Sequence, residues 1–250
     1  MLRLSPAILI SSLVAFLAGS ASGQNLIVNG GFETPPAAGS GNNTGSPAYY
    51  SNNTGLTQVT PPGTGWTFGL DTTSATDTAR IEWFKSGASE TWDRLPSATG
   101  GTYALELNSD SNTEHLYAQQ AVSLTAGKSY TLKLDIAPEI GTYNNTTPSV
   151  VVTLRNGTAL GSTAVQTFTF TATAGQWTTV TTTFQAMAGE TEIRFEDLAP
   201  NGTPQSNITL DNISLIPVTP EPGALWSASV LALSIVGLER KRLFKVFSKA

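Results

Sequence analysis

The chain has 250 residues, with 13 Lys and Arg, 18 Asp and Glu, one His and no Cys. The missing cysteines exclude disulfides, cysteine-ligated zinc and a cysteine nucleophile, and the single His115 excludes a multi-histidine metal site. Charged residues make up 12% of the chain, about half the share of an ordinary domain. The net charge of -5 argues against a nucleic-acid partner, because phosphates require basic patches.

Residues 1–23 have the pattern of a secretory signal peptide. Arg3 supplies the positive start, residues 7–18 are mostly apolar, and residues 19–23 are small and offer a cleavage region. The apolar segment is shorter than the roughly 20 residues of a membrane-spanning helix. A core helix at the N-terminus is the alternative. We expect export through the Sec translocon and removal of this segment.

Before the C-terminal segment lies the body of the protein, residues 24–217, which has the size of one β domain. Its strands are predicted by alternation of apolar and polar side chains. Alternating apolar positions occur in residues 103–107, 130–136, 150–154, 180–184 and 208–215. Further strands are expected at residues 26–28, 80–84, 116–124, 168–170 and 193–195. The pattern predicts an antiparallel sandwich of nine or ten strands.

Two local irregularities are also expected within this body. The alternation slips between Leu210 and Ile213, which predicts a β-bulge or a local kink, and Asn156-Gly157 predicts a tight hairpin turn after the strand at residues 150–154. Residues 34–65 form a long stretch rich in Gly, Asn, Pro, Ser and Thr. Such a stretch is too long for a tight connection and predicts an insertion or a binding loop.

Residues 218–250 form a second segment outside the expected domain. It contains an apolar run over residues 224–238 and a tail over residues 239–250. A helix of that apolar length is about 22 Å long, short of the roughly 30 Å hydrocarbon core of a bilayer. The apolar run is preceded by the motif Pro220, Glu221, Pro222 and Gly223. It is followed by the basic cluster Arg240, Lys241 and Arg242. The basic cluster predicts a cytoplasmic C-terminus while the body lies outside.

This order of motif, short apolar helix and basic cluster resembles the PEP-CTERM sorting signal of Gram-negative bacteria. The resemblance implies recognition by the membrane protease-transpeptidase exosortase, temporary anchoring in the inner membrane, and delivery to the cell envelope or extracellular matrix. Glu239 departs from the usual purely basic flank. A plain single-pass tail anchor is the alternative.

The body resembles carbohydrate-binding modules with the galactose-binding-like jelly-roll fold. The similarity lies in residues 25–33 (NLIVNGGFE), 103–107 (YALEL), 124–132 (LTAGKSYTL) and 210–215 (LDNISL), together with Trp66, Gln120 and Trp177. It therefore covers almost the whole domain, and it implies the fold far more specifically than it implies a sugar.

In this family the first and last strands are neighbours, so the resemblance brings Glu33 and Asp211 together. It implies a structural calcium site at these two residues, since Ca²⁺ prefers six to eight oxygen ligands. The alternative is that Glu33 caps a loop and that Asp211 accepts backbone hydrogen bonds in a turn. A bound ion would hold the two ends of the domain together in a chain without disulfides.

Sugar rings stack on flat aromatic side chains, so the aromatic residues are the candidates for ligand contact. Trp83 and Phe84 are adjacent and point to opposite faces of a strand, so that only one of them belongs to the core. Trp66 and Trp177 are expected in the core. The candidate ligand-binding residues are Trp83, Trp92, Arg94, Tyr49 and Tyr50.

A polysaccharide hydrolase would need two carboxylates about 5 to 9 Å apart, one of them with a raised pKa. The available acids are Glu82, Glu90, Asp93, Glu106, Glu114, Glu139, Glu196 and Asp197. None lies in a hydrolase motif, and His115 has no Gly-x-Ser-x-Gly partner. We therefore expect no enzymatic activity and no catalytic residue.

Taken together, these patterns predict an exported all-β protein that binds glycan or exopolysaccharide at the cell surface or in a biofilm matrix. A purely structural matrix component without a specific ligand is the first alternative, and a polysaccharide hydrolase is the second. Calcium is the one cofactor expected, in a structural role.

Overall fold

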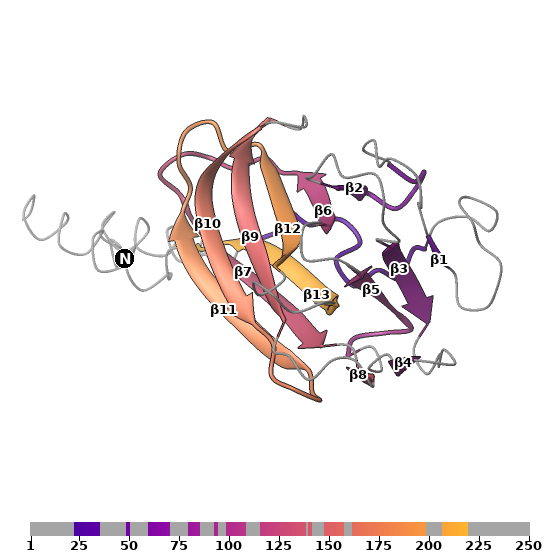
Figure 1. The fold of residues 1–250 in the computed structure, drawn as a ribbon. Coiled ribbons are helices and arrows are strands. Elements are labelled where there is room, and N and C mark those ends of the chain that lie inside the picture. Colours follow the sequence, from indigo (N-terminus) through magenta and orange to yellow (C-terminus); the bar gives the residue numbers. More distant parts are fainter. Residues whose placement is uncertain are drawn as a thin grey trace, which may run out of the picture. The chain divides into compact units, whose positions relative to one another are not determined.

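Figure 1 shows the fold in a computed structural model of the chain. The structure describes residues 23–35, 49–50, 60–70, 80–85, 93–94, 99–108, 116–138, 140–141, 148–157, 162–198 and 207–219. Within these ranges the regular structure is entirely β, as predicted, and no helix is long and apolar enough to cross a membrane. The predicted signal peptide, sorting motif, apolar run and basic tail lie outside the described residues, apart from Gly23, Val218 and Thr219.

Two antiparallel sheets make up the domain, which forms one compact unit over Gln24–Pro217. The six-stranded sheet has the order β1-β3-β5-β13-β7-β11. Its strands are β1 (Tyr49–Tyr50), β3 (Arg80–Lys85), β5 (Tyr103–Asn108), β13 (Ile208–Pro217), β7 (Ser129–Pro138) and β11 (Thr178–Gln185).

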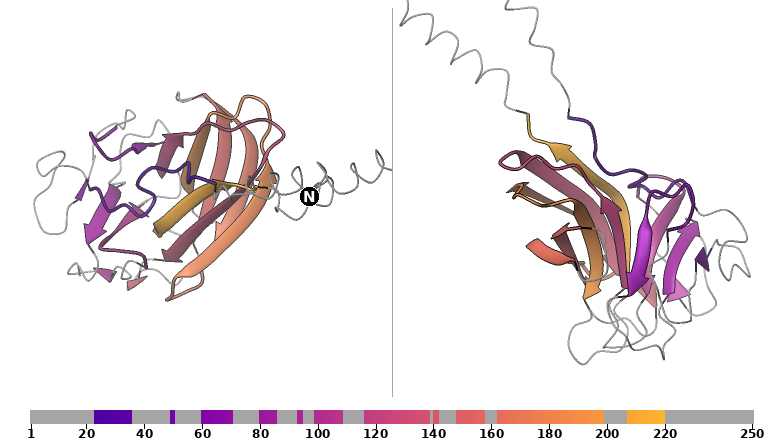
Figure 2. Two further views of the ribbon diagram at one scale, coloured as in Figure 1. Left: turned by 180° about the vertical axis from the view of Figure 1, so that it is seen from behind. Right: turned by 90° about the horizontal axis from the view of Figure 1, so that it is seen from above.

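The five-stranded sheet has the order β10-β9-β12-β6-β2. Its strands are β10 (Thr163–Thr171), β9 (Ser149–Asn156), β12 (Glu192–Leu198), β6 (Leu116–Ala121) and β2 (Thr67–Leu70). A separate small ladder pairs β4 (Asp93–Arg94) with β8 (Ile140–Gly141). Figures 1 and 2 show the two larger sheets as the two layers of a sandwich.

The core lies between the sheets and takes one side chain in two from each long strand. Tyr130, Leu132, Leu134 and Ile136 are all buried, as the alternation in β7 predicts. The inward residues of β9, β12 and β13 complete the same core. The side chains between them point to the opposite side of each sheet, because successive residues of a strand alternate. We call that opposite side the outer face.

Two of the predicted irregularities occur where expected. The register between β13 and β7 shifts between Asp211 and Ser214, and Asn212 has a φ of 50°, which confirms the bulge. Strand β9 ends at Asn156, and Gly157 has a φ of 94°, consistent with the predicted turn. The tight hairpin itself does not form, because β10 begins only at Thr163.

The predicted strand at residues 26–28 was wrong. These residues form a bend and a turn instead. Leu26 N donates to Leu215 O at 2.8 Å, but positive φ angles at Asn29 (52°) and Phe32 (56°) turn the chain away from the sheet. The beginning and the end of the domain therefore lie next to each other, as the indigo and yellow segments show in Figure 2.

Candidate functional site

The turn at residues 29–33 is fixed by two buried tryptophans. Trp66 Nε1 donates to Asn29 O at 3.0 Å, and Trp83 Nε1 donates to Phe32 O at 2.7 Å. The Phe32 ring packs between the two indoles, with centroids 5.3 and 5.4 Å away. Gly30 lies so close to Ile213 O that a Cβ would collide with it. These contacts place Glu33 beside the last strand.

Glu33 and Asp211 each bind two consecutive backbone amides within the loop of residues 99–103. Glu33 Oε1 accepts hydrogen bonds from Thr102 N (2.8 Å) and Tyr103 N (3.0 Å). Asp211 Oδ2 accepts from Thr99 N (2.9 Å) and Gly100 N (3.2 Å). Since both carboxylates accept backbone hydrogen bonds, they stabilise this loop without requiring a metal ion.

A third carboxylate, Asp135, joins this network from the neighbouring strand β7. Asp135 Oδ2 accepts from Thr99 Oγ1 (2.8 Å) and Asn212 Nδ2 (2.8 Å), and its Oδ1 accepts from Thr179 Oγ1 (2.5 Å). Burial alone would raise the pKa of Asp135. The three hydrogen bonds, together with the charge of Lys133, outweigh burial and hold the pKa below its ordinary value.

The pKa of Asp211 is shifted in the opposite direction. Its side chain is completely buried, and burial raises the pKa of its carboxyl above the ordinary value. Hydrogen bonds from Asn212, Thr99 and Gly100 oppose that shift without cancelling it. The two aspartates are direct partners in the register of β13 and β7, and they share the hydroxyl group of Thr99.

Two of the oxygens expected for calcium lie near Gly31, whereas the Glu33 carboxylate lies near Gly101. A Cβ placed on Gly31 would lie 3.9 Å from each of three atoms: Asp211 Oδ1, Asn212 Oδ1 and Glu33 Cγ. Carboxylate and amide oxygens are the ligands that Ca²⁺ prefers, so the types of residue present suit this ion. Among the described residues, no group of three or more His, Cys, Asp and Glu side chains has the spacing of a metal site.

The outer face of the five-stranded sheet carries a second concentration of polar side chains. Five residues from its five strands lie in one register row, which we call the polar row. They are Thr67 (β2), Gln119 (β6), Arg194 (β12), Thr153 (β9) and Thr167 (β10). Gln119 Oε1 accepts a hydrogen bond of 3.0 Å from Arg194 Nε.

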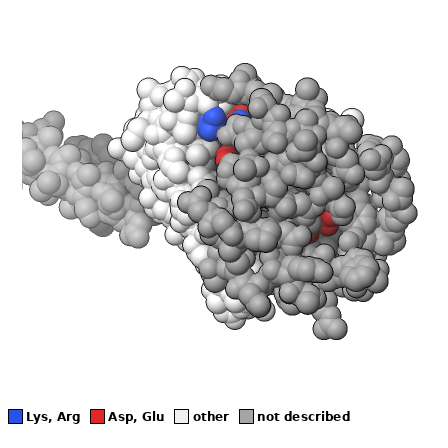
Figure 3. All heavy atoms as spheres, viewed as in Figure 1, with Lys and Arg blue, Asp and Glu red and all other residues white. Residues whose placement is uncertain are grey.

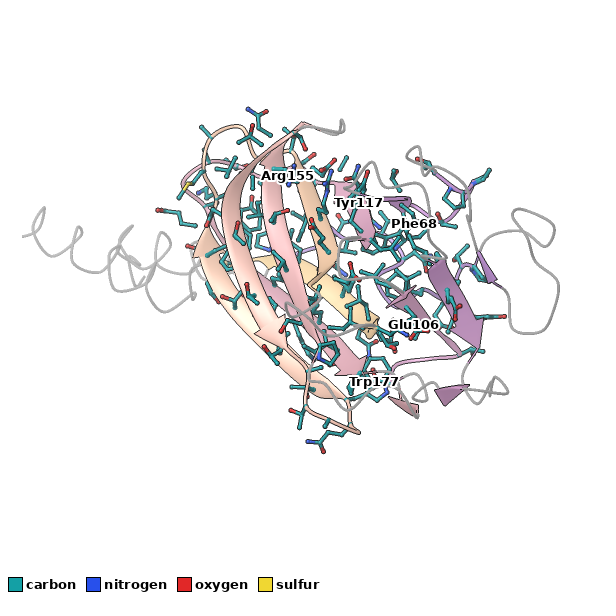
Figure 4. The ribbon with its side chains drawn as sticks, in the orientation of Figure 1. Phe68, Glu106, Tyr117, Arg155 and Trp177 are labelled. Atoms are coloured by element: carbon teal, nitrogen blue, oxygen red, sulfur yellow. The ribbon has the colours of Figure 1, made fainter. Side chains whose placement is uncertain are left out.

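Charged and aromatic groups flank the polar row. Arg194 Nη2 lies 3.7 Å from Glu192 Oε1, and Arg155 Nε lies 3.8 Å from the same oxygen. The guanidinium carbon of Arg194 lies 3.9 Å from the centroid of the Tyr117 ring, a cation–π geometry. Figure 4 labels Arg155 on β9 and Tyr117 on β6, on either side of β12.

The charged groups beside the polar row affect each other's ionisation. Burial raises the pKa of the Glu192 carboxyl, although Arg194 and Arg155 oppose the shift. The Tyr117 ring requires a glycine beside it, because a Cβ on Gly69 would collide with the phenol group. The side chains are therefore packed into one arrangement.

Burial changes along the polar row. Arg194 and Gln119 are buried, while Thr167 at the β10 end is exposed. Thr153 lies at the boundary and is 5% exposed. Its hydroxyl group has no hydrogen-bond partner in the part of the chain that the structure describes. Buried hydroxyl groups are nearly always hydrogen-bonded, so the Thr153 hydroxyl is an exception within the polar row.

Of the predicted ligand-binding residues, the structure describes the side chain of Trp83 alone. Trp83 is completely buried and packs edge-on against Phe32 and Phe68, so it is a core side chain and presents no surface to a sugar. Trp66 is buried as expected. Tyr49 and Tyr50 form β1, and Arg94 belongs to β4, but their side chains and the whole of Trp92 lie outside the described residues.

Two of the acids considered for hydrolysis do meet. Glu82 on β3 and Glu106 on β5 are direct cross-strand partners on the outer face of the six-stranded sheet, and both are buried. Both also make further contacts within the chain. Their position shows how a strand register can pair two acids without any sequence motif.

Sequence reasoning did not identify the polar row. Its signal was the alternation of Glu192, Arg194 and Glu196 with the apolar residues Ile193 and Phe195. Such alternation usually indicates a solvated strand face. Only the register with β6 and β9 shows that Arg194 meets Gln119 and Thr153 and that Glu196 meets Tyr117.

Comparison with known families gives one clear match. Residues 24–216 match the family described as HpiC1-like, HpiC1 cyclase. The chain belongs to the HpiC1-like family. No curated protein matched the chain. The match covers the same residues as the predicted resemblance to carbohydrate-binding modules, but it carries the name of a cyclase.

Several solved structures have a similar fold. A cyclase from Fischerella sp. TAU, in complex with 4-(1H-indol-3-yl)butan-2-one, has a TM-score of 0.50 and 18% identity over 79% of this chain and 99% of that chain. The module TmCBM61, in complex with β-1,4-galactotriose, has a TM-score of 0.45 and 14% identity over 78% of this chain and 99% of that chain. At these identities the likeness shows the fold alone.

The active domain of tailspike protein 4 from bacteriophage CBA120 has a TM-score of 0.46 and 13% identity. The match covers 78% of this chain but only 21% of the tailspike chain. The HpiC1-like chain has an antiparallel two-sheet β-sandwich, and a fold by itself does not determine function.

Proposed function

We propose that this HpiC1-like protein is exported, sorted by exosortase through residues 218–250, and binds extracellular polysaccharide without catalysing a reaction. The observation that supports binding is the polar row on the outer face of the five-stranded sheet. It offers hydroxyl, amide and guanidinium groups in one line across five strands.

A sugar chain would approach the polar row from β10. Thr167 and Thr169 are exposed there, and both belong to the outer face. The Thr153 hydroxyl is buried and unpartnered among the described residues, so a ligand hydroxyl lying against β9 would hydrogen-bond it once the groups that cover it move aside. The buried groups beyond it, Arg194 and Gln119, would orient that hydroxyl rather than contact the ligand. Sugar recognition of this kind depends on a few oriented polar groups.

The direct test is titration of the protein with isolated capsule and biofilm polysaccharides, using calorimetry. Thr153→Val removes the hydroxyl group and preserves the shape of the side chain, so we expect at least tenfold weaker binding with an unchanged fold. Thr131→Val on the other sheet is the matched control, and its binding should equal that of the wild type. Absence of saturable binding to any polymer would overturn the proposal in favour of a purely structural matrix component.

Sorting is tested separately by the intact mass of the protein isolated from its native envelope. Cleavage near residue 23 and within residues 218–250, with or without attached polymer, is the expected result. A mass that retains all of residues 218–250 would contradict exosortase processing and would favour a plain tail anchor.

Calcium is proposed as the structural cofactor of the domain. Glu33, Asp211 and Asn212 would supply oxygen ligands, and the ion would hold the two ends of the domain together. The ion would have no part in glycan binding at the polar row, which belongs to the other sheet.

A cyclase activity is the second candidate, and the family match favours it. Asp211, with its raised pKa, is the proton donor to consider. However, both of its oxygens already accept hydrogen bonds from residues 99–100 and Asn212, and its side chain is completely buried. A proton donor must reach its substrate, so this geometry favours a structural role. The test is incubation with 4-(1H-indol-3-yl)butan-2-one and related indoles. Turnover that is abolished by Asp211→Asn would replace the binding proposal.

A further inference from the structure

The exposed apolar side chains of the domain gather at one of its ends. The large hydrophobic residues that are exposed within the described part of the chain are Val28 (62%), Met187 (52%), Ile216 (37%) and Val218 (47%). Val218 follows the last strand, β13, directly, and the other three belong to the compact unit. Exposed hydrophobic residues that are scattered singly need no explanation, whereas a group of them marks an interaction site.

Strand register places Met187 and Ile216 at the same end of the sandwich. Ile216 is the partner of Thr131, near the start of β7. Met187 comes shortly after β11, and the last residue of β11 is the partner of the first residue of β7. The residue before Met187 donates its backbone N–H to Lys128 O at 2.8 Å, which fixes this segment beside the turn that precedes β7.

Val28 lies at this end as well. Its backbone is held by Gln120, near the end of β6: Val28 N donates to Gln120 Oε1 at 3.0 Å, and Gln120 Nε2 donates to Val28 O at 2.6 Å. The end of β6 pairs with the start of β12, because Ala121 is the partner of Glu192. The segment that joins β11 to β12 contains Met187. We call the end that carries Val28, Met187 and Ile216 the apolar end.

The exposed charge at the apolar end is positive. Lys128 is exposed there, whereas the acids Glu190 and Glu192 are buried. The Glu190 carboxylate accepts hydrogen bonds from Met187 N (2.8 Å) and Gln166 Nε2 (2.7 Å), which keep it inside the protein. Figure 3 shows that the described surface in its view also carries few charged side chains. The apolar end therefore differs in sign from the chain as a whole, whose net charge is -5.

A lipid surface is the partner that this end fits. The apolar run over residues 224–238 begins seven residues after Pro217, a span of at most about 25 Å of extended chain. Trp226 stands near the start of this run, and tryptophans concentrate at the boundary between lipid and water. A helix over the run would be about 22 Å long, shorter than the roughly 30 Å hydrocarbon core. A short anchor thins the bilayer around it or draws its flanking residues to the interface, and either response brings the end of β13 close to lipid.

We propose that the apolar end docks on the outer surface of the membrane in which the chain is anchored. Val28, Met187 and Ile216 enter the interfacial layer, and Lys128 binds the phosphate groups of anionic lipids. This docking rests on the anchoring proposed for residues 218–250 and adds a second contact with the same membrane. It also orients the domain: the turn at residues 172–177, at the other end of β11, points away from the lipid.

The absence of cysteine allows a fluorophore to be placed at a single position of the full chain. Met187→Cys reports on the apolar end, Gln176→Cys on the turn at the far end of β11, and Leu231→Cys on the anchor. Each labelled chain is reconstituted into vesicles of phosphatidylethanolamine and phosphatidylglycerol that contain lipids with a nitroxide quencher near the top of the acyl chain. We expect the nitroxide to quench the dye at residues 187 and 231 by at least half and to leave the dye at residue 176 unchanged.

The pattern of quenching separates docking from the anchoring on which it rests. Quenching at residue 231 without quenching at residue 187 would overturn docking and leave the anchor in place. Equal quenching at residues 187 and 176 would also overturn docking, because the domain would then touch lipid without a preferred end. Quenching at neither residue 187 nor residue 231 would overturn both proposals. Quenching at residue 187 alone would support docking and contradict the anchor.

Two substitutions in the labelled Met187→Cys chain test the apolar contact itself. Val28→Asp places a charge among the docking side chains, so we expect the quenching at residue 187 to fall by at least half. Thr173→Asp adds the same charge at the far end and should leave the quenching unchanged. Both positions are exposed, and Gln120 bonds the backbone of Val28 rather than its side chain, so both variants should fold, which circular dichroism checks.

The same loss of quenching in both variants, or no loss with Val28→Asp, would contradict the proposal. A second copy of the chain is the other occupant that the experiment detects. A dye emission at residue 187 that shifts with protein concentration in the absence of lipid would assign the apolar end to contact between proteins and would overturn docking on the membrane.

Discussion

Glu33 lies near the start of the domain sequence and Asp211 near its end, yet both bind backbone amides of the same loop. Glu33 Oε1 accepts from Thr102 N and Tyr103 N, and Asp211 Oδ2 accepts from Thr99 N and Gly100 N. The loop thus joins the first turn of the domain to its last strand. In a chain without disulfides this connection closes the sandwich.

Calcium binding is predicted to stabilise this connection. At about one hundred times its Kd the ion would contribute about 2.7 kcal/mol, a rise in Tm of roughly 5–10 °C for a domain of this size. Thermal melts in EDTA and in excess Ca²⁺ measure the effect. Glu33→Gln should remove most of the difference between the two melts. An identical Tm in EDTA and Ca²⁺ for the wild type would show that the carboxylates act alone.

Asp135 is predicted to make stability fall at acidic pH. Its folded pKa lies below its ordinary value, so its contribution is present above that ordinary value and is lost as the pH falls through the folded pKa. Asp135→Asn should cost about 2 kcal/mol at pH 7, because hydrogen bonds to a charged group are lost. Urea unfolding from pH 7 to pH 2 measures the free energy, and the wild type and the variant should converge at the acidic end. A difference that is the same at every pH would contradict the role of the charge.

Asp211 is predicted to change the free energy of unfolding with pH in the direction opposite to Asp135. Its pKa is raised, so its ionisation opposes folding as the pH rises through the folded pKa. Asp211→Asn should therefore lose less stability at pH 7 than Asp135→Asn, although both remove hydrogen bonds to Thr99. The same urea series tests this order, and a larger loss for Asp211→Asn would show that its four hydrogen bonds outweigh the burial of its charge.

Gly69→Ala is predicted to destabilise the five-stranded sheet by about 1–3 kcal/mol, the usual cost of overpacking. The added Cβ would collide with the Tyr117 ring, which is held between β2 and the Arg194 guanidinium. In the double variant with Tyr117→Leu, the alanine should cost much less, and a double-mutant cycle measures this coupling. Additive costs would mean that the ring moves away freely.

Trp83→Phe is predicted to reduce stability by about 2 kcal/mol without any direct effect on polysaccharide binding. The change leaves a cavity beside Phe32 and Phe68 and removes the hydrogen bond to Phe32 O. Chemical denaturation and the calorimetric titration described above measure the two effects separately. Weaker polysaccharide binding by a fully folded variant would indicate that Trp83 contributes to ligand binding after all.

Local pattern accounts for much of the fold. In β7 the residues Tyr130, Leu132, Leu134 and Ile136 alternate with polar neighbours, and each is buried as predicted. The slip at Leu210–Ile213 marked a real bulge. The failure at residues 26–28 has a definite cause: three apolar residues gave no sign that Asn29 and Phe32 adopt positive φ angles, because tertiary contacts with Trp66 and Trp83 stabilise them.

By itself the sequence determined that the domain is all-β, which residues of the long strands face the core, and where β13 is interrupted. These properties repeat every two residues, so they can be read from near neighbours. Only the tertiary structure decided that Arg194 lies between Gln119 and Thr153, and that β11 is an edge strand among the described strands of its sheet. Strand order and register depend on contacts between residues far apart in the chain, and no local periodicity encodes them.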